Sequence, residues 1–141
     1  MMRYDDTEMR RVLDECGESY RYPVYCSVGI IDNFFSRGRP MQAYAAVSDT
    51  YLYIVSYSTL GVFSGEGKMF RIPLAGINRL TVRRMLLMHG YNIDIKARAD
   101  GKSIRLKLNI SAALLGTADK FPEQNVNVDA LTDELNRYST E

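Results

Sequence analysis

Basic side chains recur at every second position in three consecutive segments that resemble strands. Arg79–Met85, Tyr91–Arg98 and Ser103–Ile110 alternate apolar and polar residues, and successive side chains of a strand point to opposite faces of its sheet. If the apolar residues point inward, the outer face carries Arg79, Arg83, Lys96, Arg98, Arg105 and Lys107, with Asp94 among them. Such a face could bind an anionic partner, such as a membrane leaflet, an acidic protein or nucleic acid. The alternative is an ordinary solvated face, because alternation itself requires polar residues there.

A second set of residues suited to anions lies in the loop predicted over Ile31–Pro40. It places two phenylalanines beside two arginines, namely Phe34, Phe35, Arg37 and Arg39. Phenylalanine can insert at a membrane interface while arginine contacts phosphate. The alternative is that one ring fills the open end of the fold and the arginines are solvated.

Tyrosines make one predicted strand, Tyr51–Tyr57, apolar on both faces. Tyr51, Tyr53, Val55 and Tyr57 alternate with Leu52 and Ile54, and Tyr44 of the preceding strand is expected to lie across from them. One face must be core, and the other needs cover from the N-terminal helix or from another protein chain. The helix would contribute Met9, Val12 and Leu13. Because tyrosine is favoured at interfaces, this set is also a candidate surface for self-association.

Catalytic chemistry has little support in the sequence. The single histidine, His89, adjoins Gly90 in a predicted turn and has no neighbouring serine or cysteine pattern. Cys16 and Cys26 have no accompanying residues at metal-ligand spacing, and we expect them to be small buried side chains. We therefore expect no enzyme activity, no metal and no cofactor.

The remaining pattern places these residues on a mainly β chain with one helix at each end. A helix is predicted over Asp5–Cys16 and a second over Val128–Tyr138, capped by Asn127. The predicted strands before the three basic ones are Tyr22–Ile31, Met41–Val47, Tyr51–Tyr57 and Lys68–Ile72. This order gives seven strands, of which the last three form an antiparallel meander.

Length and composition favour one domain. The chain has 141 residues, 46% of them hydrophobic, and a formal net charge of +1, which suits a single core. The apolar run Met85–Met88 is far shorter than the roughly 20 residues of a membrane-spanning helix. Acidic residues occupy the N-terminal segment where an export signal would be apolar, so we expect a cytoplasmic protein.

The order of elements resembles the pleckstrin-homology-like (PH-like) fold, in particular its small bacterial versions. The resemblance covers roughly residues 20–140 and rests on the hairpin 45–54, on Ile72-Pro73-Leu74 leading to Ile77, and on the final helix. It implies two packed, roughly orthogonal antiparallel sheets, a partly open barrel, closed by the C-terminal helix, with the N-terminal helix as an addition. Membrane-binding relatives use the loop that corresponds to 31–40.

We predict a non-enzymatic binding module. The favoured hypothesis is protein–protein interaction or self-association, as a homo-oligomer, through Met9, Val12, Leu13, Tyr44, Tyr51, Tyr53 and Tyr57. The alternative is weak peripheral binding to an anionic phospholipid membrane through the loop 31–40 and the basic outer face. Nucleic acid is not an expected partner.

Overall fold

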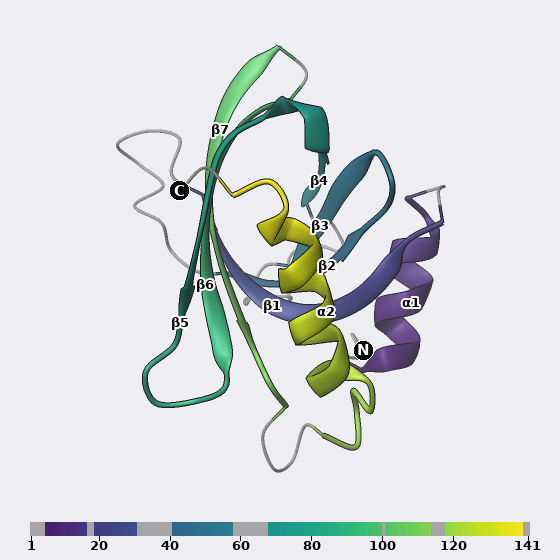
Figure 1. Cartoon of the computed structure of the whole chain (residues 1–141). Helices are drawn as coiled ribbons and strands as arrows, with labels where there is room; N and C mark the ends of the chain where they lie inside the picture. Colours follow the sequence, from purple (N-terminus) through teal and green to yellow (C-terminus); the bar gives the residue numbers. More distant parts are fainter. Residues whose placement is uncertain are drawn as a thin grey trace.

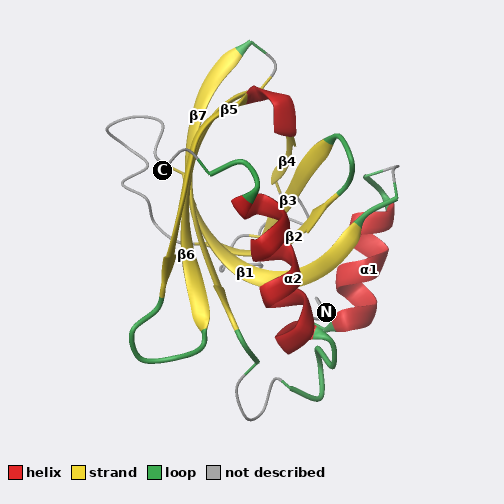
Figure 2. Ribbon diagram, viewed as in Figure 1, coloured by secondary structure: helices red, strands yellow, loops and turns green. Residues whose placement is uncertain are grey.

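The computed structural model describes residues 5–16, 19–30, 41–57, 68–99, 101–113 and 118–139. The elements follow the order α1 (Asp6–Asp14), β1 (Arg21–Ile30), β2 (Met41–Val47), β3 (Tyr51–Tyr57), β4 (Lys68–Pro73), a short 3-10 helix (Leu74–Gly76), β5 (Ile77–Arg84), β6 (Gly90–Ala99), β7 (Lys102–Ser111) and α2 (Gln124–Asn136). Figure 2 shows strands forming most of the molecule and the two longer helices beside them. The predicted elements are confirmed, with ends that differ by a few residues.

All seven described strands belong to one antiparallel sheet in the order β4-β3-β2-β1-β7-β6-β5. The joining strand is β1, which pairs with β2 on one side and, through residues 27–30, with residues 106–109 of β7 on the other. The sheet curves, so that β4 also lies close to β6. The two separate packed sheets expected from the sequence are therefore not confirmed.

Helix α2 lies inside the curve of the sheet, as Figure 1 shows. Its buried residues Val128, Leu131 and Leu135 pack into the main hydrophobic core. The inward-facing residues of the last three strands meet them there: Leu80, Ile93, Ile95, Leu106 and Leu108 are at most 1% exposed. The alternation in the sequence thus identified the core face of β5, β6 and β7 correctly.

Two buried amides fasten the first turns of α2 to β1. The Gln124 side chain accepts from the Tyr25 backbone N–H at 3.0 Å and donates to the backbone oxygens of Tyr25 and Ser111, each at 2.9 Å. Asn127 donates to the Pro23 oxygen at 3.0 Å. The prediction that Asn127 caps the helix is wrong: α2 begins at Gln124, and the amide of Asn127 bonds instead to a β1 carbonyl, at an irregularity in the strand's pairing.

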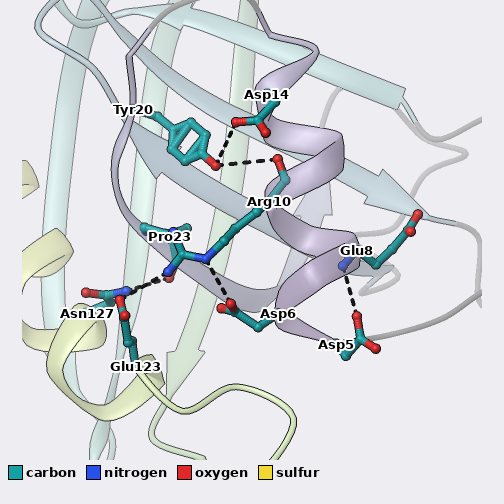
Figure 3. A network of polar contacts seen from close by, with 9 residues as sticks. All are labelled: Asp5, Asp6, Glu8, Arg10, Asp14, Tyr20, Pro23, Glu123 and Asn127. Atoms are coloured by element: carbon teal, nitrogen blue, oxygen red, sulfur yellow. Dashed lines mark hydrogen bonds and ion pairs between the residues drawn. The ribbon is translucent and has the colours of Figure 1, made fainter.

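Helix α1 covers the outer face of the other half of the sheet. Asp5 caps it by accepting from the Glu8 N–H at 2.9 Å. Arg10 donates to Asp6 at 2.8 Å and to Glu123 at 3.1 Å, the latter tying α1 to the start of α2. The Arg10–Glu123 pair thus links α1 to the residue before α2 (Figure 3), while the body of α1 packs against β1, β2 and β3.

The covered surface forms a second hydrophobic cluster. Its members are Met9, Val12 and Leu13 from α1, Cys16 just after that helix, Tyr44, Ala46, Tyr53 and Val55 from the sheet, and Phe121. Tyr44, Tyr53 and Leu13 are 0% exposed. Cover by the N-terminal helix, the alternative considered from the sequence, is thus confirmed. The contact between α1 and the sheet buries both sides. The residues proposed as an open contact surface are therefore covered within the chain: Met9, Val12, Leu13, Tyr44 and Tyr53.

Candidate anion-binding face

The outer side of β5, β6 and β7 carries the basic face, defined by Arg79, Arg83, Lys96, Arg98, Arg105 and Lys107, all of which are exposed. The strand register places these residues in cross-strand rows. Lys96 pairs with Arg79 on one side and with Arg105 on the other, giving three cations in one row. The next row runs Thr81, Asp94, Lys107, and the row nearest the β5–β6 turn runs Arg83, Asn92, Asn109. Five of the six cations therefore lie in three neighbouring rows.

This face is hollowed rather than flat. A depression of about 540 Å³ is lined by five of the six cations, by Asp94, and by three neutral polar side chains, Thr81, Asn92 and Asn109. The cations donate hydrogen bonds only, whereas the amides and the hydroxyl both donate and accept. The depression therefore offers mainly positive charge together with a smaller number of acceptor groups.

Asp94 is the acidic side chain among the residues that line the depression. Its carboxylate lies 3.6 Å from Arg105 Nε, and the two side chains are 42% and 48% exposed. An exposed pair at this distance neutralises little of the surrounding charge. Arg98 lies farther along β6 and donates to the Gly101 oxygen at 3.4 Å in the β6–β7 turn. The face thus keeps an excess of positive charge directed toward solvent.

The other predicted anion-contact residues, Phe34, Phe35, Arg37 and Arg39, lie outside the described residues. Among the tyrosines, Tyr51 is partly exposed at the edge of the α1 cluster, where the guanidinium of Arg71 lies 5.5 Å from its ring centroid. Tyr57 pairs with Gln42 through its backbone, and its side chain lies outside the described part of the chain. Self-association through the tyrosines stays a prediction that requires α1 to move away.

His89 lies in the β5–β6 turn, as the sequence predicted, and contacts α2. Its Nε2 lies 2.7 Å from Asp129 Oδ1, which also accepts from the Tyr91 hydroxyl at 2.8 Å. Burial alone would raise the pKa of Asp129, but the hydrogen bonds from Tyr91 and His89 together hold that pKa below its ordinary value. The residues lining the depression do not include His89. This cluster therefore connects two elements and stands apart from the basic face.

Sequence reasoning missed one exposed feature, the apolar residues of the β5–β6 turn. Leu86 and Leu87 are each 98% exposed and Met88 is 44% exposed. The available signal was the position of this apolar run between two predicted strands and just before His89-Gly90, where the sequence predicts a turn.

Comparison with protein-family models and with curated proteins finds no match to this sequence. Within the described residues, no helix has the length and apolar character needed to cross a bilayer.

Proposed function

We propose that this protein is a non-enzymatic binding module, built on a PH-like scaffold, whose basic face receives an acidic segment of a protein partner. The observation that carries the proposal is the set of cross-strand rows: cations from β5, β6 and β7 surround one depression. The scaffold part rests on the antiparallel sheet closed by a C-terminal helix.

Charge repulsion within the face supports a binding role. Arg79, Lys96 and Arg105 are direct cross-strand neighbours, and like charges in that position destabilise a sheet. A face that is only solvated could carry basic and acidic residues as cross-strand neighbours, with no change to the core. An acidic partner would relieve the repulsion and gain charge-assisted hydrogen bonds.

The mixed chemistry of the depression favours a polypeptide over a leaflet or a nucleic acid. Phosphate groups only accept hydrogen bonds, so they gain nothing from the acceptor oxygens of Asn92 and Asn109. A polypeptide carries backbone N–H donors beside its carboxylates and can use both kinds of group. Nucleic acid would also benefit from exposed rings on which bases stack, and the residues lining the depression contain none.

A second copy of this chain is a specific candidate for that partner. Residues 1–20 and 119–141 are both net acidic, while 79–118 is strongly basic. On α2 and the turn before it, Asp119, Glu123 and Asp133 are exposed. Light scattering at low and high salt separates the two cases, because a self-complex raises the mass of the protein alone and dissociates as salt screens the charges.

The test is a titration of the protein into a fluorescently labelled peptide rich in Asp and Glu, followed by anisotropy. We expect binding that weakens steeply with salt, and no binding of the same peptide with Asn and Gln in place of the acids. Lys96→Glu/Arg105→Glu should weaken binding by about tenfold or more, since it reverses two charges at the centre of the face.

The matched control is Lys120→Glu/Arg137→Glu, which changes the net charge by the same amount. Lys120 lies in the turn before α2 and Arg137 at the C-terminal end of the helix; both are exposed, and neither lines the depression. Equal loss of binding in both variants would show a net-charge effect and overturn the assignment of the site.

A further inference from the structure

The β5–β6 turn displays two leucines outside the folded core. The strands end at Arg84 and begin again at Gly90, and Met85 N–H donates to the Gly90 oxygen at 2.9 Å, closing the loop 86–89. Leu86 and Leu87, each 98% exposed, lie at the far end of the long hairpin that projects from the molecule in Figure 1. Adjacent, fully exposed leucines at a projecting tip are a typical mark of an interaction site.

The base of the turn is held rigidly on two sides. His89 oxygen accepts from the Ala112 N–H at 2.9 Å, which ties the turn to the end of β7. His89 and Tyr91 both reach Asp129 on α2. Gly90 packs so closely that an added Cβ would lie 2.6 Å from the Ile110 oxygen and 2.8 Å from Met85 Sδ. The leucines are thus presented by a fixed support, with little ordering left to occur on binding.

The chain on either side of the tip is cationic. From Ile77 to Ile93 the sequence contains Arg79, Arg83 and Arg84 but no Asp or Glu. Arg83 and Arg84 directly precede the turn and are exposed. Apolar residues at a tip with arginines just behind them match the two layers of an anionic membrane surface, acyl chains below and charged headgroups above.

We propose that Leu86 and Leu87 insert into the interface of an anionic phospholipid bilayer while Arg83 and Arg84 contact its headgroups. A bilayer accepts a convex apolar tip without a complementary pocket, and its negative surface complements the two arginines. Arg83 belongs to both sites, but Leu86, Leu87 and Arg84 lie outside the basic face, so this proposal does not rest on the acidic partner assigned there.

The tip and most of the basic face can be occupied together because they lie at different distances from the membrane surface. Arg79 is seven residues before Leu86, or up to roughly 20 Å along an extended strand. The headgroup layer on one side of a bilayer is only about 5–8 Å thick. With the tip inserted, most of the basic face would stand above the headgroups and remain open to a soluble partner.

Insertion can be followed with a single fluorophore, because the chain contains no tryptophan. Leu87→Trp places one at the tip, and Val126→Trp, at a position 72% exposed on α2, is the matched control. On adding phosphatidylcholine vesicles that contain phosphatidylserine, we expect a blue shift of the emission for Leu87→Trp alone. Vesicles of phosphatidylcholine only should give a smaller shift, since they lack the charge that attracts the arginines.

Vesicle co-sedimentation of the wild-type chain and its variants completes the test. Leu86→Ser/Leu87→Ser should lower partitioning by about tenfold or more with an unchanged unfolding midpoint, because both residues are exposed. Arg84 lies outside the basic face. The variant Arg84→Gln should lower binding to the phosphatidylserine vesicles only.

Three results would overturn the proposal: no blue shift at the tip, wild-type partitioning by the double-serine variant, or loss of vesicle binding in Lys96→Glu/Arg105→Glu without loss in the leucine variant. The last result would assign the membrane contact to the basic face. Failure of peptide binding to the basic face would leave the tip proposal intact.

Discussion

At the scale of single residues, burial raises the pKa of the Cys26 thiol from its ordinary value of 9.0 to about 12. Burial also raises the pKa of Cys16, against the opposing effect of nearby Arg71. Both cysteines are present as thiols, and thiolate is the reactive form. We expect neither to react with a thiol reagent at pH 8 until the chain unfolds. Cys26 stays protonated when folded but ionises when unfolded, so its contribution to stability should decline as pH rises above 9.0. Rapid labelling of Cys26 under native conditions would contradict its burial.

At the scale of the sheet, the row Arg79, Lys96, Arg105 predicts that a substitution which weakens peptide binding also stabilises the fold. Lys96→Glu would place a carboxylate between two arginines, and opposite-charge cross-strand pairs stabilise by about 0.2–1 kcal/mol each. We expect the free energy of unfolding in urea to rise by about 0.5–1 kcal/mol, less at high salt, while peptide binding weakens. Lys102→Glu is the control, because Lys102 pairs with Ala99 rather than with a cation. A loss of stability in Lys96→Glu would show that Lys96 has a structural role.

At the scale of the whole molecule, one sheet separates two hydrophobic clusters. Alternate residues of β2 serve both: Ala43 and Ala45 face the main core, and Tyr44 and Ala46 face α1. Because the strands are shared, we expect the clusters to unfold together. Leu13→Ala in the α1 cluster and Leu131→Ala in the main core should each cost about 2–5 kcal/mol, with a single urea transition seen by both circular dichroism and tyrosine fluorescence. An early transition present only in Leu13→Ala would mean that α1 detaches on its own.

The helices, the strands and the two faces of the last three strands could be predicted from the amino-acid pattern alone. Strand and helix periods are local properties, so the alternation around Leu80, Ile95 and Leu106 predicted which side is core, and the positions of Arg79 and Lys107 followed from it. The first residue of α2 was less predictable. Gln124 and Asn127 bond to backbone groups of β1 that lie about 100 residues away in the chain.

How those elements cover one another could not be predicted from local patterns, because it depends on the folded arrangement of the whole chain. Pairing of β1 with β7 joins the strands into one sheet, and it depends on contacts between residues far apart in the sequence. The same holds for the burial of Tyr44 and Tyr53 under α1 and for the exposure of Leu86 and Leu87. An apolar pattern shows that a side chain can be buried, but whether it is buried depends on which surface the folded chain brings against it.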